Sequence, residues 1–122
     1  MVITMTLPSP RRELVTWEDV DRLIDHILPQ FRREFTAMVM ITRGGIVPGG
    51  LLAQAMDVTH VLTAAVNFPA QIASETTKLM AWPDFLQFPA DELLRGRPTL
   101  IVDDVWGSGR TMAAVKNRVS AA

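Results

Sequence analysis

Two adjacent carboxylates, Asp103 and Asp104, stand where an apolar run ends and a loop of small residues begins. The run before them, residues 99–102, is rich in β-branched side chains and lies between Pro98 and Gly107, a pattern typical of a fully covered strand of a parallel sheet. Burial explains the apolar residues but not the acids, because uncompensated buried carboxylates are costly. At the end of such a strand, two carboxylates can bind sugar hydroxyls or a hydrated divalent cation.

The loop after the acids has the composition of an anion-binding turn. Gly107 and Gly109 allow the backbone to turn tightly and to approach a ligand. We expect a helix to begin near Thr111, and its free N–H groups and dipole favour a phosphate. The acids and the loop together predict a site for a sugar phosphate.

A second turn, Arg43-Gly44-Gly45, follows the apolar run of residues 38–42. A cation and two flexible residues at the carboxyl end of a strand form an anion cradle, at the sheet edge where doubly wound folds bind ligands. Taken alone, such a turn also has an ordinary structural explanation. Its combination with the acidic strand predicts a ligand that carries two phosphate groups.

The remaining elements are those of a scaffold. Thr16 and Asp19 resemble a helix capping arrangement, and apolar residues then recur at helical spacing until Pro29. This pattern predicts an amphipathic helix with a solvated polar face, which includes His26, and we do not expect His26 to be catalytic.

A βαβ unit is predicted next. Residues 38–42 form a strand, a helix runs through residues 51–56, and residues 60–66 form another strand candidate. Residues 67–87 lack steady periodicity and indicate a long excursion with short strands, a kind of loop that is often functional. A short helix around residues 90–94, closed by Gly96, leads to the acidic strand, and the chain is expected to end inside its last helix. The predicted fold class is α/β, a Rossmann-like parallel sheet with flanking helices.

Composition supports a single domain over residues 1–122, with 48% hydrophobic residues, 20% charged residues and a formal net charge of −1. No run is long enough to span a membrane, and no export signal is indicated. The absence of cysteine fits a reducing cytoplasm and excludes disulfides. The near-neutral charge argues against a broad nucleic-acid surface, so small polar metabolites are the expected partners.

The segment Leu100–Thr111 resembles the signature of the type I phosphoribosyltransferase family, in which a strand, two acids and a small-residue loop bind phosphoribosyl pyrophosphate (PRPP). The Thr42–Gly45 turn looks like the pyrophosphate loop of that family. The residues Leu14–Trp17, followed by Arg43–Gly49, are similar to the bacterial xanthine-guanine branch. The resemblance covers about residues 13–118.

This resemblance implies transfer of the phosphoribosyl group from PRPP to a nucleobase, with release of pyrophosphate. The nucleobase is expected to be a purine, as in purine salvage, and Mg²⁺ is expected to bind the pyrophosphate. Asp103 and Asp104 would hold the ribose hydroxyls, directly or through metal-bound water. The implied 5′-phosphate site comprises Trp106, Gly107, Ser108, Gly109, Arg110 and Thr111. The implied pyrophosphate site comprises Thr42, Arg43, Gly44 and Gly45, and the analogy implies a cis Thr42–Arg43 peptide bond. Lys78 lies in the segment that corresponds to the family's mobile loop, and the resemblance makes it a candidate loop contact to phosphate, beside the ordinary interpretation as a surface lysine.

Two features depart from the family pattern. Enzymes for 6-oxopurines carry an aspartate as general base where this chain has Gly107, and general acid–base help is typically worth about a hundred- to ten-thousand-fold. Adenine and orotate enzymes carry small or neutral residues there. The chain also offers fewer core strands than the family sheet and no C-terminal hood, which predicts a fragment, a pared-down fold or a sheet edge completed by a partner chain. A homo-oligomer is therefore expected.

A different class of function fits the same motif. The family includes pyrimidine-operon attenuators that bind RNA, and their signature also ends in Gly-Arg-Thr, as Gly109-Arg110-Thr111 does here. A non-catalytic PRPP- or nucleotide-sensing regulatory protein is therefore the alternative, although the arginines are scattered in pairs rather than arranged in a basic stripe. The sequence leaves open which nucleobase is used, and whether Trp82, Phe85 or Trp106 stacks on it.

Overall fold

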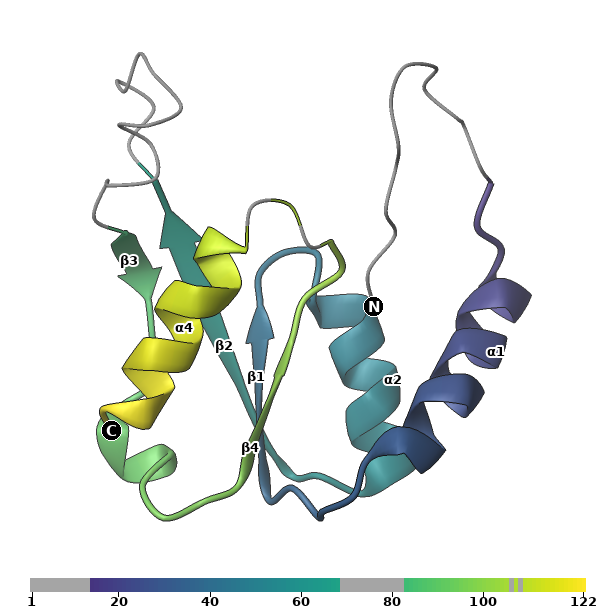
Figure 1. Cartoon of the computed structure of the whole chain (residues 1–122), viewed down its shortest axis with the longest axis horizontal. Helices are drawn as coiled ribbons and strands as arrows, with labels where there is room; N and C mark the ends of the chain where they lie inside the picture. The colour runs from purple at the N-terminus through teal and green to yellow at the C-terminus, as the bar shows by residue number, and fades with distance from the viewer. Residues whose placement is uncertain (1–13, 69–82, 106, 108) are drawn as a thin grey trace.

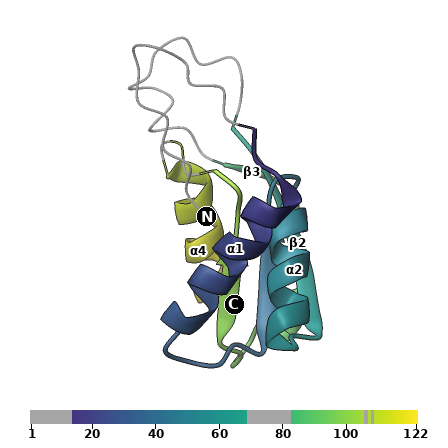
Figure 2. The same ribbon diagram turned by 90° about the vertical axis from the view of Figure 1, so that its right-hand side faces the viewer.

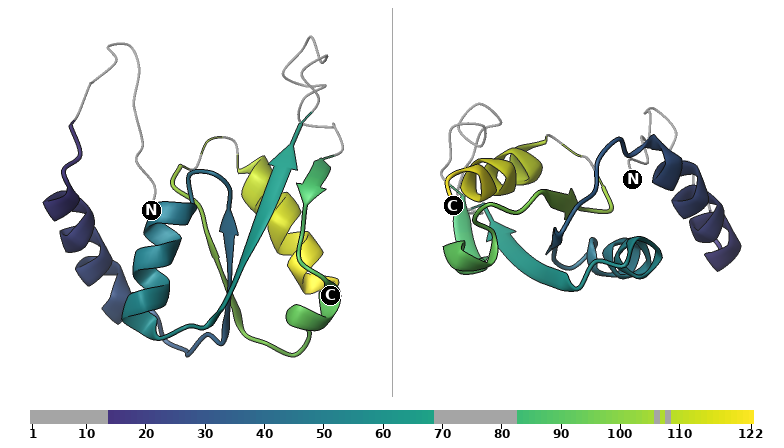
Figure 3. Two further views of the ribbon diagram at one scale, coloured as in Figure 1. Left: turned by 180° about the vertical axis from the view of Figure 1, so that it is seen from behind. Right: turned by 90° about the horizontal axis from the view of Figure 1, so that it is seen from below.

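The computed structural model describes residues 14–68, 83–105, 107 and 109–122 (Figure 1). A four-stranded sheet carries helices on both faces (Figure 3). The elements in chain order are α1 (Trp17–Ile27), the 3₁₀ helix η1 (Leu28–Gln30), β1 (Ala37–Ile41), α2 (Ile46–Met56), β2 (His60–Asn67), β3 (Asp84–Gln87), the 3₁₀ helix η2 (Asp91–Leu93), β4 (Thr99–Val102) and α4 (Arg110–Ser120). The predicted α/β class is confirmed.

The sheet order is β3-β2-β1-β4. Strand β1 is parallel to β2, as the βαβ pattern predicted, and also to β4, as expected for a parallel sheet. Met40 of β1 is in register with Val102 of β4. The carboxyl ends of these strands therefore lie side by side, and the two predicted anion-binding loops leave the sheet at one edge. Strand β3 lies antiparallel to β2 and supplies a short strand of the 67–87 excursion.

Strand β1 is the centre of the core, and all of its residues are buried. Met38 and Met40 pack with residues of α1 and α2 on one face of the sheet. Val39 and Ile41 pack on the other face, against a cluster that includes Val115 of α4. Figure 2 shows the helices from the side on which α1 lies in front.

Helix α1 begins as predicted. The Thr16 hydroxyl accepts a hydrogen bond from the Asp19 N–H at 3.1 Å, and the Asp19 carboxylate accepts one from the Thr16 N–H at 3.0 Å. This reciprocal capping box satisfies two amides that a helix N-terminus otherwise leaves open.

Two predicted helix ends were wrong, and one predicted short helix is of the 3₁₀ type. Helix α2 begins at Ile46 rather than near Leu51, because Pro48 falls in its first turn, where the missing N–H is tolerated. The predicted helix at 90–94 is a single 3₁₀ turn, and α4 ends at Ser120, inside the chain.

Strand β4 is not fully covered, contrary to the prediction. Only Val102 is buried, and the other three residues are half-buried. Within the described residues β4 pairs with β1 alone, so it forms an edge of the sheet. In the part of the chain that the structure describes, no helix is long and apolar enough to cross a bilayer.

Candidate functional site

The site forms where the loop after β4 meets the loop after β1. The Asp104 carboxylate lies directly against the Cα of Gly44, so that a Cβ built on Gly44 would overlap the carboxylate. Any residue with a side chain would force one of the loops to move. The structure thus brings together the acidic motif and the Arg43-Gly44-Gly45 turn, which are 60 residues apart in the chain.

Gly45 allows the loop after β1 to lie close to the ends of β1 and β4. Its N–H donates to the Ile41 carbonyl at 2.8 Å. A Cβ at this position would come within 2.7 Å of the same oxygen and would also contact the Val102 carbonyl. The peptide bond between Thr42 and Arg43 is cis, as the resemblance implied.

The two acids interact with each other. The Asp104 N–H donates to Asp103 Oδ1 at 2.9 Å, and both residues are half-buried. Burial raises the pKa of Asp103 above its ordinary value; the hydrogen bond from the Asp104 amide opposes this rise, whereas the Asp104 side chain adds to it. A proton or a cation at this pair is therefore favoured.

Two helices direct uncapped N-termini toward this edge. Helix α2 starts after Gly45 and α4 after Gly109, and neither has a side-chain cap. Gly109 has φ +81°, a left-handed conformation that favours glycine. By contrast, α1 provides its own capping box, as described above. At α2 the N–H groups of Gly45 and Ile46 already donate to the carbonyls of Ile41 and Arg43, and Pro48 has no N–H. The N-terminus of α4 is therefore the better site for an anion.

A cavity of about 200 Å³ opens at the start of α4. It is lined by Asp103, Val105, Gly107, Gly109, Arg110, Thr111 and Met112. Val105 and Met112 were not predicted, because an apolar side chain beside a motif carries no chemical signal of its own. The tight turn expected at Gly107 does not itself require glycine, since the φ of Gly107 is not in the left-handed region. Among the described residues, no heavy atom beyond its chain neighbours lies within 4 Å of a Cβ built there.

The remaining residues predicted for the site lie at its edge, in the core or outside the described residues. Arg43 is exposed and Thr42 is half-buried at the end of β1. The Arg110 guanidinium lies 4.8 Å from the ring centre of Phe68, which joins the first turn of α4 to the end of β2. Phe85 packs edge-to-face on Phe88 at 5.4 Å within the core, which favours the packing role left open above. Trp82, Lys78, Trp106 and Ser108 lie outside the described residues.

The donor set fits a Mg²⁺ ion that is shared with a ligand. Within the described ranges, no cluster of three or more His, Cys, Asp or Glu side chains could enclose a metal. Asp103 and Asp104 remain as a pair of carboxylates whose mutual repulsion a cation would relieve. Mg²⁺ is typically bound in this way, by one or two carboxylates together with substrate phosphates and water.

Comparisons with known proteins agree with this geometry. The phosphoribosyl transferase domain family matches residues 13–121. The xanthine-guanine phosphoribosyltransferase of Cereibacter sphaeroides is 35% identical over 81 residues, which are 66% of this chain and 45% of that protein. The adenine phosphoribosyltransferase of Pelodictyon phaeoclathratiforme is 29% identical over 96 residues, 78% of this chain and 54% of that protein. The chain thus spans about half the length of these relatives.

Solved structures give the same result. A purine phosphoribosyltransferase from Pyrococcus horikoshii superposes with a TM-score of 0.68 and 25% identity, over 87% of this chain and 66% of that one. A Neisseria gonorrhoeae protein with bound ppGpp superposes with a TM-score of 0.65 and 22% identity, over 86% of this chain and 61% of that one, a likeness of fold. With two acids at the end of β4, a glycine turn against them and a family match over nearly its whole length, this chain belongs to the phosphoribosyl transferase domain family.

Proposed function

We propose that this chain binds PRPP with Mg²⁺ and transfers the phosphoribosyl group to a purine base, with release of pyrophosphate. The contact of Asp104 with Gly44 is the observation that carries the proposal, because it places a carboxylate pair between two amide-rich loops. A ligand that has hydroxyls in the middle and a phosphate group at each end matches this order. The names of the relatives support a purine as the acceptor.

Each loop takes one part of PRPP. Asp103 and Asp104 accept hydrogen bonds from the ribose hydroxyls. The amides of Gly109 and the first turn of α4 hold the 5′-phosphate, together with the Thr111 hydroxyl beside the cavity. Arg43 and the Gly44 amide hold the pyrophosphate. The acidic pair is thereby placed beside the anomeric carbon.

The reaction needs little covalent chemistry from the protein. As the bond from the anomeric carbon to pyrophosphate breaks, the ribose becomes cationic and the pyrophosphate gains charge, and the base nitrogen then bonds to that carbon. Fixed carboxylates stabilise the first charge, and fixed amides with Arg43 stabilise the second. Bound Mg²⁺ would supply further neutralisation of the pyrophosphate.

The direct test is a turnover assay with PRPP, Mg²⁺ and each of xanthine, guanine, hypoxanthine and adenine, in which pyrophosphate and the nucleotide are quantified. The proposal predicts equal amounts of both products with at least one purine. Saturable PRPP binding without turnover on any base would contradict it and would favour the sensing alternative.

Replacement of Gly44 should disable the site without harm to the fold. Gly44→Ala places a methyl group where the Asp104 carboxylate lies, so we expect PRPP affinity to fall by at least about tenfold, or 1.4 kcal/mol. Gly50→Ala is the matched control, because outside its own helix no atom of the described residues lies within 4 Å of a Cβ there. It should leave affinity unchanged and stabilise α2 by up to about 1 kcal/mol. Equal effects of the two variants in calorimetry would argue against the contact.

The open space at Gly107 permits a gain of function. Because no atom of the described residues beyond its chain neighbours lies within 4 Å of a Cβ there, Gly107→Asp should fold normally and introduce the acid that 6-oxopurine enzymes carry at this position. We expect kcat with guanine or hypoxanthine to rise by about a hundredfold or more. Gly107→Asn, of similar size but without a basic carboxylate, should give no such increase. A similar rise for both variants would refute a general-base effect.

The acidic pair should lower the stability of the ligand-free protein. Since the pKa of Asp103 is raised above 3.8 in the folded chain, the folded state holds that proton more tightly than the unfolded state. Its contribution to stability is present below pH 3.8 and is lost as pH rises through the raised pKa. Asp103→Asn should remove this pH dependence and modestly raise the melting temperature at neutral pH, while it abolishes the stabilisation by PRPP. Thermal unfolding across this pH range checks the sign, and a lower melting temperature at neutral pH would contradict it.

A further inference from the structure

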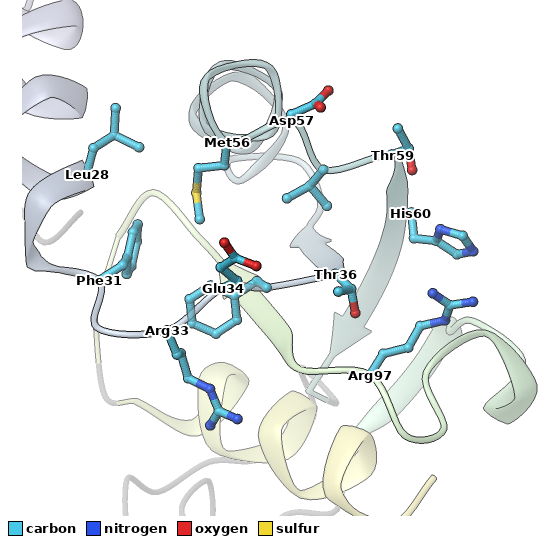
Figure 4. A pocket seen from close by; sticks show the side chains of 12 residues that line it. Leu28, Phe31, Arg33, Glu34, Thr36, Met56, Asp57, Thr59, His60 and Arg97 are labelled. Atoms are coloured by element: carbon cyan, nitrogen blue, oxygen red, sulfur yellow. The ribbon is translucent and has the colours of Figure 1, made fainter.

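A larger cavity lies at the opposite end of the sheet, at the amino ends of β1, β2 and β4 (Figure 4). Its volume is about 650 Å³, within the range of about 300–1,000 Å³ common for small-ligand pockets. Among the described residues, none lines both this cavity and the cavity beside Asp103. A ligand here would therefore leave the PRPP site free.

One end of this cavity is suited to an anion. Arg97 precedes β4, His60 begins β2 and Thr36 precedes β1, so three neighbouring strands each bring one polar side chain to the same edge. The Thr36 N–H donates to the Pro98 carbonyl at 3.0 Å, which holds the segments that carry Thr36 and Arg97 together.

These polar side chains remain available. Figure 4 shows the Arg97 guanidinium directed toward the His60 ring. Among the described residues, neither side chain forms a hydrogen bond or an ion pair. A guanidinium, an imidazole N–H and a hydroxyl together form a donor set that fits a phosphate.

The other end is apolar and aromatic. Phe31 and Phe35 pack edge-to-face, with ring centres 5.6 Å apart, and Leu28, Met56 and Val58 continue the wall. Glu34 lies between the two ends in Figure 4. Its carboxylate has no cationic partner within the part of the chain that the structure describes. A flat ring that carries N–H donors would satisfy both the aromatic wall and this carboxylate.

We propose that this cavity is a second ligand site that binds a nucleoside monophosphate. The phosphate contacts Arg97, His60 and Thr36, and the base lies by Phe31 and Phe35 with an N–H donated to Glu34. The site is distinct from the proposed PRPP site and does not depend on it.

The test is a titration of the full ¹⁵N-labelled chain with GMP, followed by amide NMR. We expect saturable shifts at Phe31, Thr36 and His60. Guanosine, which lacks the phosphate, should bind more weakly, and inorganic phosphate should shift Thr36 and His60 but not Phe31.

Variants separate the two sites. Arg97→Ala should lower the affinity for GMP at this cavity at least about tenfold. Arg95 is an exposed arginine in the same loop that does not line the cavity, so Arg95→Ala should leave this affinity unchanged. The Asp103→Asn, Asp104→Asn double variant should also leave the affinity for GMP at this cavity unchanged. Shifts confined to residues 107–111, or equal affinity in the Arg97→Ala and wild-type chains, would overturn the proposal.

Discussion

The parallel pairing of β4 with β1 is the constraint on which the site depends. Because Met40 and Val102 are in register, the loops that follow the two strands start at the same level of the sheet. Only then can the Asp104 carboxylate lie against Gly44, where no Cβ can be accommodated. The buried residues of β1 hold this pairing from both faces, so core packing and site geometry have the same origin.

Stability and ligand binding make opposite demands at this edge. The scaffold helix α1 is capped by its own side chains, whereas α2 and α4 have glycine at the N-cap position and therefore no side-chain cap. The acids likewise stand side by side, and burial raises the pKa of Asp103. Each of these features costs some stability in the ligand-free chain, and each is relieved by a ligand that carries phosphates, hydroxyls and a cation.

Local chemistry made much of this predictable from the sequence. The capping box at Thr16, the parallel strands and the two loops each have a signal within a few residues. Features set by tertiary contacts were not predictable: β4 lies at the edge of the described sheet, and Gly107 has room for a side chain. The second cavity was not predicted for the same reason, because Thr36, His60 and Arg97 are far apart in the sequence and form no motif.

We propose that the acidic strand end and the glycine turn form one PRPP site. The most direct measurement is a calorimetric titration of the chain with PRPP, with and without Mg²⁺, beside the Asp103→Asn, Asp104→Asn double variant. We expect saturable, Mg²⁺-dependent binding that the double variant loses. A folded chain that does not bind PRPP, or binding that the double variant retains, would contradict it.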